Sequence, residues 1–203
     1  MSKPFLKISL LSMAAGALLV GIAGSSAAKV EGDTIVLGAA VSITGKYSTN
    51  GKNTKDGYDL AVKRVNETGG VKVGGKSYKL KVVYYDDEST PARGAQLAER
   101  LISQDGVKFL LGPYSSGLTK AIAPVTEKYK IPMVEAEGAS RALFTQGYRY
   151  LFGIISTSEQ YLSSSIDLAA ELAEKAGRKP ADVKIAMAFE NDPFSLDVRA
   201  GVV

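Results

Sequence analysis

The feature that most constrains the fold of this chain is a regular alternation of short apolar runs with segments of helical periodicity. Apolar runs of strand length occur at residues 34–41 (TIVLGAAV), 107–111 (VKFLL), 131–135, 150–155 and 183–189. Segments with apolar residues at helical spacing occur at residues 53–68, 91–106, 117–129 and 158–177. The run at residues 34–41 is continuous, which is typical of a strand that is buried on both faces of a sheet. The alternation therefore predicts an α/β fold of βαβ units, with a parallel sheet covered by helices.

A glycine pair interrupts this alternation. Residues 71–73 and 77–86 flank Gly74-Gly75, and this arrangement predicts a hairpin with a tight turn. Residues 70–77 also fit the phosphate-loop pattern G-x-x-x-x-G-K-S, but that loop needs a strand before it and a helix after it. Here a predicted helix precedes and a predicted strand follows, so the glycines are assigned to the hairpin.

The domain organisation follows from what surrounds residue 150. The predicted strand at 150–155 has no predicted helix before it, which indicates that the chain passes into a second domain there. After the strand at 183–189 only the start of a helix follows, at 196–203, and two such elements cannot enclose a core. We therefore expect an α/β lobe over residues 29–150, the start of a second lobe over 151–203, and further chain beyond Val203 that completes both.

The N-terminal segment, residues 1–28, has the pattern of an export signal. Lys3 and Lys7 precede an apolar run at residues 8–22, and small side chains follow at Ser25-Ser26-Ala27-Ala28. This pattern predicts a signal peptide cleaved after Ala28. The alternative is an uncleaved membrane anchor, for which a run of about 15 apolar residues is short. The mature protein is therefore expected in the periplasm.

The chain contains no Cys, His or Trp, and the absence of Cys and His excludes several kinds of chemistry. Disulfides, Cys/His zinc sites and a Ser-His-Asp triad cannot form. The formal net charge is +4, and no stretch clusters five or six basic residues, so nucleic acid is not an expected partner. We expect a protein that is not an enzyme and that needs neither a cofactor nor a metal.

Two loops that follow predicted strands carry small residues and hydroxyl groups. They are Tyr114-Ser115-Ser116, which precedes a predicted helix, and Gly138-Ala139-Ser140. Ligands bind at the carboxyl ends of parallel strands in open α/β sheets, and the positive N-terminal end of a helix favours a carboxylate. The alternative is that Ser115 or Ser116 only caps the helix, and from the sequence both interpretations stay open.

Two further motifs are not interpreted as catalytic or metal-binding sites. Pro113 stands where a serine nucleophile elbow needs glycine, and no His is present to act as its base, so a nucleophilic serine is excluded. Asp86-Asp87-Glu88 follows a predicted strand. It is interpreted as a solvated acidic turn rather than a metal site, because a metal needs ligands from several directions.

Four segments together resemble the periplasmic branched-chain amino acid binding proteins, the type I solute-binding components of ABC importers. They are residues 35–51 (IVLGAAVSITGKYSTNG), 65–91 (VNETGGVKVGGKSYKLKVVYYDDESTP), 107–117 (VKFLLGPYSSG) and 131–140 (IPMVEAEGAS). The resemblance extends over residues 33–203, the first half of the family's usual length. It implies two Rossmann-like lobes with parallel sheets, the second truncated here, which close on a small ligand.

The resemblance also implies a binding site. In that family a serine loop holds the ligand's carboxylate, and Tyr114, Ser115 and Ser116 correspond to it. The loop that meets the ligand's ammonium end corresponds to Gly138, Ala139 and Ser140. Phe194 matches an aromatic of the second lobe that covers the ligand, and Tyr47 lies where family members line the entrance.

The chain departs from the family pattern at two places. Ser89 and Tyr114 occupy positions where members often carry a disulfide, and Glu135-Ala136-Glu137 replaces the more usual Ser-Pro. The second change leaves an aromatic acid or amide as an alternative to a branched-chain amino acid.

The function that the resemblance implies is capture of an amino acid or a related small carboxylate by lobe closure. The protein would then present it to the membrane permease subunits of an ABC transporter, as a monomer. The alternative is a ligand-sensing receptor domain of the same fold, which a membrane span or output module after Val203 would favour. An enzyme is disfavoured by the missing His and Cys, and by the absence of G-x-G-x-x-G after the first strand.

Overall fold

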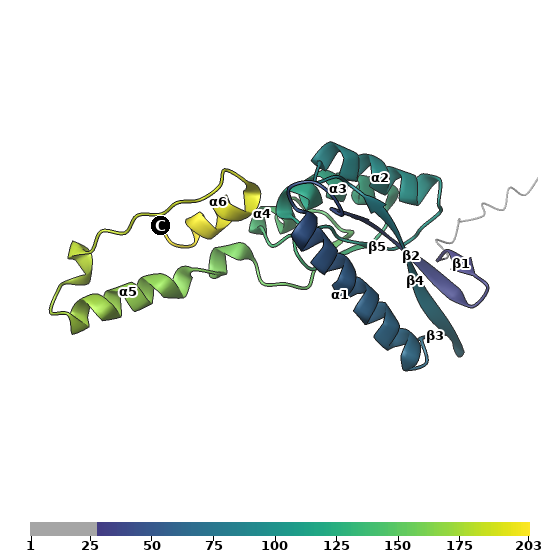
Figure 1. Ribbon diagram of the computed structural model, residues 1–203, viewed down its shortest axis with the longest axis horizontal. Helices are drawn as coiled ribbons and strands as arrows, with labels where there is room; N and C mark the ends of the chain where they lie inside the picture. The colour runs from purple at the N-terminus through teal and green to yellow at the C-terminus, as the bar shows by residue number, and fades with distance from the viewer. Residues whose placement is uncertain (1–27) are drawn as a thin grey trace, which may run out of the picture.

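The computed structural model describes residues 28–203 (Figure 1). The strands are β1 (Val30–Glu31), β2 (Thr34–Val41), β3 (Val71–Val73), β4 (Lys76–Asp86), β5 (Leu110–Leu111), β6 (Met133–Glu135) and β7 (Leu151–Gly153). The helices are α1 (Ser48–Glu67), α2 (Pro91–Ser103), α3 (Ser116–Tyr129), α4 (Arg141–Phe144), α5 (Ser163–Lys175) and α6 (Pro193–Ala200), with short 3-10 turns η1 (Ser158–Gln160) and η2 (Pro180–Asp182). All of the predicted signal peptide except Ala28 lies outside the described residues.

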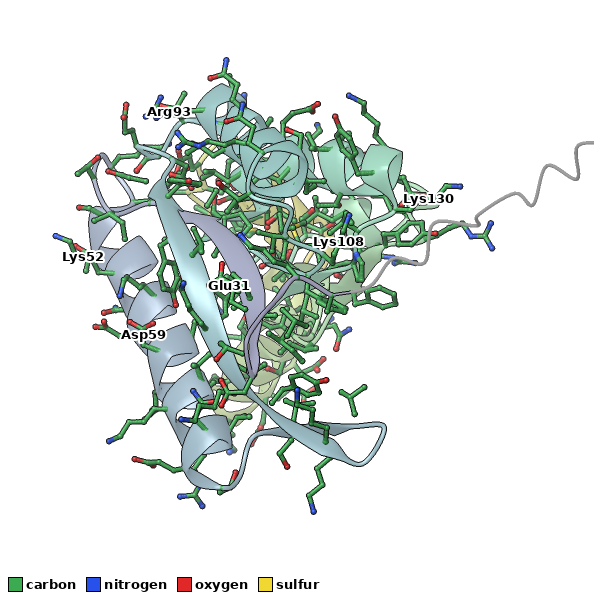
Figure 2. All side chains as sticks on the ribbon, turned by 90° about the vertical axis from the view of Figure 1, so that its right-hand side faces the viewer. Glu31, Lys52, Asp59, Arg93, Lys108 and Lys130 are labelled. Atoms are coloured by element: carbon green, nitrogen blue, oxygen red, sulfur yellow. The ribbon has the colours of Figure 1, made fainter. Side chains whose placement is uncertain are left out.

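The strands form one sheet in the order β3-β4-β2-β5-β6-β7, and β1 pairs with β2. The pairs β2–β4, β2–β5, β5–β6 and β6–β7 are parallel, which confirms the predicted parallel sheet. α2 and α3 pack against each other on one side of this sheet, and α1 lies on the other side (Figure 1). The edge-on view shows α1 beside β4, with Lys52 pointing away from the sheet (Figure 2).

The core lies between the sheet and the α2–α3 pair. The apolar stripe of α2 places Leu97 and Leu101 there, and α3 adds Ile122. Leu101 is completely buried, and it approaches so closely that a Cβ on Gly38 of β2 would lie 3.1 Å from its side chain. Burial of these side chains is the main free-energy gain of this half of the molecule.

The glycine pair forms the predicted hairpin turn. β3 and β4 pair antiparallel with Val73 opposite Lys76, so Gly74 and Gly75 are the two loop residues. Their φ angles are +57° and +80°, the left-handed values that a type I′ turn requires at both positions. α1 precedes this hairpin and the strand β4 follows the turn, so the segment lacks the strand-before, helix-after order that a phosphate loop needs.

Several predicted element bounds are wrong. The strand predicted at 107–111 covers only Leu110–Leu111, because the backbone N–H of Val107 donates to the carbonyl of Leu101 at the end of α2. The strand predicted at 183–189 does not form. No strand of the described residues lies beside it, and Ile185 is 54% exposed. An isolated strand leaves its backbone groups without ladder partners, so the apolar run alone does not make one.

The predicted domain boundary at residue 150 falls just before a strand of the first sheet. β7 pairs in parallel with β6, and the chain leaves the sheet only after Gly153. We therefore call residues 30–153 the sheet lobe and residues 154–203 the second segment. Among residues 28–203, no helix combines the length and the apolar character needed to cross a bilayer.

The second segment reaches away from the sheet lobe along α5 and returns to it through α6 (Figure 1). Asp197 of α6 fixes this return, because its Oδ2 accepts hydrogen bonds from the backbone N–H of Arg141 at 2.6 Å and from Oγ of Ser158 at 2.9 Å. The backbone N–H of Ser158 also donates to the carbonyl of Ala139 at 2.8 Å. The loops after β6 and after β7 are therefore held together beside α6.

Candidate ligand-binding site

A cavity of about 380 Å³ lies between the sheet lobe and the second segment. The sheet lobe lines it with Tyr47, Tyr114, Ser115, Ser116, Glu137 and Ala139, and the second segment lines it with Ile155, Tyr161, Glu190, Asp192, Phe194 and Ser195. The sheet-lobe residues come from the loops that follow β2, β5 and β6 and from the first turn of α3, at the carboxyl edge of the parallel strands. The volume falls in the range of small-molecule sites.

Ser115 lines this cavity and does not use its hydroxyl to cap α3. It is the residue before α3, with extended backbone angles (φ −140°, ψ −170°), and its side chain makes no capping hydrogen bond to the helix. The interpretation of Ser115 as only a helix cap is therefore not supported. The hydroxyl and the first N–H groups of α3 together form a place where a carboxylate is stabilised.

Ser116 has a different role from its neighbour. Its Oγ accepts a hydrogen bond from the backbone N–H of Ser140 at 3.1 Å, and the residue is 1% exposed. It thus joins the loop after β5 to the loop after β6. Oγ of Ser140 is buried and has no hydrogen-bond partner among the described residues.

A buried acid, Glu135, lies at the base of the loop after β6. Its Oε1 accepts hydrogen bonds from the backbone N–H groups of Glu137 and Gly138, both at 2.7 Å. Its Oε2 accepts from Oγ1 of Thr119 on α3, also at 2.7 Å. Burial raises the pKa of Glu135 to about 7, although the hydrogen bonds from Gly138, Thr119 and Glu137 oppose this shift.

Two aromatic pairs form opposite parts of the cavity wall. Tyr47 and Tyr114 of the sheet lobe meet edge to face, with ring centroids 5.4 Å apart. Tyr161 and Phe194 of the second segment meet in the same way at 5.8 Å. Such pairs give a ligand an apolar surface on two sides.

The start of α6 brings Phe194 to the cavity. Asp192 is the residue before this helix, and its Oδ1 accepts hydrogen bonds from the backbone N–H groups of Phe194 at 2.8 Å and Ser195 at 3.3 Å. Pro193 then occupies the first helical position. Asp followed by Pro is a helix-start signal that can be recognised in the sequence. It places the start of this helix at residue 193, three residues before the predicted start at 196.

Six of the predicted site residues line the cavity, namely Tyr47, Tyr114, Ser115, Ser116, Ala139 and Phe194. Gly138 and Ser140 do not line it. The N–H of Gly138 binds Glu135, and a Cβ on Gly138 would lie 2.4 Å from Oγ1 of Thr119, so this position needs glycine for close packing. The lining residues that the sequence did not single out are Glu137, Ile155, Tyr161, Glu190, Asp192 and Ser195.

The acidic run Asp86-Asp87-Glu88 is not the solvated turn that the sequence predicts. Asp87 is completely buried, and its Oδ1 accepts hydrogen bonds from Oγ of Ser42 at 2.6 Å and from the N–H of Ser89 at 2.8 Å. Oγ of Ser89 in turn accepts from the N–H of Tyr47 at 3.0 Å. The run therefore holds the loop that carries Tyr47. Within the described part of the chain, no three acidic residues cluster as metal ligands.

The cavity lies between the carboxyl edge of the parallel sheet, the N-terminus of α3 and the second segment. This arrangement is typical of two-lobed solute-binding proteins. The comparisons with known proteins agree with this class. The model of the periplasmic binding protein family matches residues 34–203, and the chain belongs to this family. This confirms the predicted type I fold.

The similar proteins are solute-binding proteins rather than enzymes. Leu/Ile/Val-binding protein homolog 8 of Brucella abortus (strain 2308) is 31% identical over 165 residues, which are 81% of this chain and 40% of that protein. An ABC-transporter solute-binding protein from R. palustris, solved with 4-hydroxybenzoate, is 29% identical with a TM-score of 0.65, over 83% of this chain and 42% of that one. A branched-chain amino acid transporter substrate-binding protein from Streptococcus pneumoniae, solved with isoleucine, is 28% identical with a TM-score of 0.57, over 66% and 39%. The chain thus spans about 40% of the length of these relatives.

Proposed function

We propose that this protein is the extracytoplasmic solute-binding component of an ABC transporter and that it binds a small carboxylate between its lobes. The observation that carries the proposal is the position of Ser115 at the start of α3, where its hydroxyl does not cap the helix and the residue lines a cavity shared by both parts of the chain. A carboxylate there accepts hydrogen bonds from the hydroxyl and from helix N–H groups.

The rest of the ligand is expected to be apolar and flat or branched. The Tyr47–Tyr114 pair and the Tyr161–Phe194 pair offer aromatic surface on two sides of the cavity. Glu137, Glu190 and Asp192 add carboxylates to the lining, which can accept hydrogen bonds from an ammonium or a hydroxyl group. A hydrophobic amino acid and a hydroxylated aromatic acid both fit this description, and the similar proteins include one solved with isoleucine and one solved with 4-hydroxybenzoate.

The proposal includes the way in which the ligand is held and delivered. Binding would bring the two lobes together around the ligand, and the closed form would dock on the permease subunits. Delivery of this kind requires export to the periplasm, which the predicted signal peptide at residues 1–28 supports, and it requires only one copy of the chain.

The test is a ligand screen with purified full-length protein. Melting temperature is measured against hydrophobic amino acids, aromatic acids, sugars and nucleotides, and hits are followed by calorimetry. We expect a carboxylate to raise the melting temperature and to bind with a dissociation constant on the order of micromolar. Hits confined to sugars or nucleotides would reject the proposed site.

A further inference from the structure

We propose that Glu135 is a positioning residue of this ligand site: its buried carboxyl group fixes the loops after β5 and β6, and it takes up a proton when a ligand carboxylate binds at Ser115. This inference rests on the proposed function and deepens it, because it states how the site responds to the charge of its ligand. Glu135 does not line the cavity and acts through the residues that do.

Glu135 is in contact with two of the loops that line the cavity, those after β5 and β6. In the loop after β6, its Oε1 accepts from the N–H groups of Glu137 and Gly138, which directly precede Ala139 of the cavity wall. In the loop after β5, it packs so closely on Gly112 that a Cβ there would lie 2.2 Å from its Oε2. A shift of this one carboxyl group would therefore displace the backbone on both sides.

Thr119 connects Glu135 to Ser115 through a single shared proton. Oγ1 of Thr119 lies 2.7 Å from Oε2 of Glu135 and 2.9 Å from the carbonyl oxygen of Ser115. A hydroxyl group has one proton, so it can donate to only one of these two acceptors at a time. Two arrangements of the same atoms are then possible, and the charge of Glu135 selects between them.

The two arrangements differ in the direction of the hydrogen bond between Glu135 and Thr119. When Glu135 is ionised, Thr119 donates to Oε2, and the carboxylate accepts three hydrogen bonds. When Glu135 is neutral, its proton lies on Oε2 and is donated to Oγ1 of Thr119, and Thr119 donates to the carbonyl of Ser115. All donors keep an acceptor in both arrangements, so protonation changes the charge without breaking the loop apart.

The surroundings of Glu135 favour the neutral form when an anion is present. None of the ion pairs formed within residues 28–203 includes Glu135. The charge of Glu137 in its own loop acts on Glu135, and Glu135 acts on Tyr58 of α1, and neither of these groups supplies a positive charge. α3 presents the uncharged Thr119, and the loop after β5 presents the uncharged Gly112.

A ligand carboxylate at Ser115 would place a second negative charge close to this uncompensated acid. Like charges in a poorly hydrated site raise the pKa of the weaker acid. Because burial already raises the pKa of Glu135 to about 7, the additional shift occurs in the physiological range. Ligand binding is therefore coupled to proton uptake, and the affinity falls as the pH rises above 7.

The experiment measures binding by calorimetry from pH 6 to pH 8.5, with L-leucine and 4-hydroxybenzoate as probes, since both keep an ionised carboxylate throughout. For the full-length wild-type protein we expect the affinity to fall roughly three- to tenfold over this range. At pH 7.5, titrations in buffers of different ionisation enthalpy should show net proton uptake by the protein. This second measurement needs no variant.

Glu135→Gln and Glu137→Gln are the matched variants. Gln at 135 keeps an oxygen for the two backbone N–H groups and mimics the neutral acid, so the affinity should become independent of pH and the proton uptake should vanish. Glu137→Gln removes a carboxylate of the cavity wall whose charge also raises the pKa of Glu135, so the proton uptake should become smaller but persist.

The outcomes separate this inference from the proposed function. Wild-type binding that is independent of pH and takes up no proton would overturn the role of Glu135 while leaving the carboxylate site intact. Proton uptake that disappears in Glu137→Gln instead would assign the effect to the wall residue and would also overturn it. Failure of both probes to bind at any pH would reject the proposed function for these ligands, and the inference with it.

Discussion

The sheet lobe and the second segment differ in what they bury. The core cluster of this protein lies entirely within the sheet lobe, where residues such as Leu101, Ile122 and Met133 are shielded from solvent. In the second segment, Leu168 and Leu172, which lie one turn apart on α5, are 53% and 54% exposed, although Ala173 of the same helix is buried. Figure 1 shows α5 apart from the sheet, whereas α2 and α3 lie against it.

This difference teaches that an apolar stripe becomes a core only where another element packs on it. α2 and α5 are both helices of 13 residues with an apolar face. α2 has a parallel sheet and α3 beside it, whereas the strand predicted at 183–189, which would accompany α5, does not form. The candidate ligand site lies where these two unequal parts meet, apart from the core cluster of the sheet lobe.

The largest effect that can test this comparison is a cavity in the core. Leu101→Ala removes a completely buried side chain, and we expect a loss of about 2–5 kcal/mol in the free energy of unfolding. The matched change Leu168→Ala removes a half-exposed side chain and should cost less than about 0.5 kcal/mol. Urea denaturation of both variants measures the two values.

An equal loss of unfolding free energy in Leu168→Ala would contradict the difference between the two parts of the molecule. It would show that the face of α5 that carries Leu168 is covered in the protein in solution.

The second prediction separates the two serines of the site. Ser115→Ala removes the uncommitted hydroxyl at the start of α3, and we expect the affinity for the carboxylate found in the screen to fall roughly 10- to 100-fold. The melting temperature should change little, because this hydroxyl makes no hydrogen bond to the helix. In Ser116→Ala, the N–H of Ser140 loses its acceptor, so stability should fall together with affinity.

Calorimetry and thermal denaturation of the same samples measure both quantities. Undiminished binding by Ser115→Ala would move the carboxylate site away from α3.

The third prediction concerns the pH dependence of stability in the sheet lobe. The pKa of Glu135 is raised from 4.5 to about 7 in the folded protein, so the folded state holds this proton more tightly than the unfolded state does. Its contribution is fully present below pH 4.5 and is lost as the pH rises to 7. Relative to Glu135→Gln, the wild-type protein should lose about 2 kcal/mol of unfolding free energy between pH 5 and pH 8.

Denaturation curves at a series of pH values give this difference. A constant offset between the two proteins would show that Glu135 is ionised in both the folded and the unfolded state.

The smallest expected effect belongs to the ion pair between the two parts. Nζ of Lys46 lies 3.4 Å from Oε1 of Glu190, and both side chains are mostly exposed. Exposed pairs contribute little, so Glu190→Gln should lower the free energy of unfolding by less than about 0.5 kcal/mol, and high salt should cancel the difference. A larger, salt-resistant loss would show that the second segment is held on the sheet lobe by this pair.

Much of the fold could be predicted from the sequence because it depends on local patterns. The strand at residues 34–41 appears with the predicted bounds, and the turn at Gly74-Gly75 appears as expected, since only glycine adopts two successive left-handed conformations at low cost. The start of α2 at Pro91 also follows from a local signal. The run at 183–189 is also mostly apolar, yet no strand within residues 28–203 lies beside it.

The candidate site was predictable in position but not in the roles of its residues. The sequence places Ser115 and Ser116 at a helix start, and their equivalence there left capping and ligand binding open. The structure separates them, because Ser116 accepts the N–H of Ser140 while Ser115 makes no capping bond. It also adds Tyr161, which no local motif marks, because the second segment folds back over the sheet edge.

The sequence by itself determined the parallel α/β architecture, the exclusion of cysteine and histidine chemistry, and the loops at which we propose that a ligand binds. These follow from periodicity, composition and turn chemistry, which act over a few residues. Only the tertiary structure decided that Glu135 is buried beneath both loops, that Asp87 is an internal brace and that residues 183–189 do not form a strand. Burial and strand pairing depend on partners far away in the chain, so no local pattern could fix them.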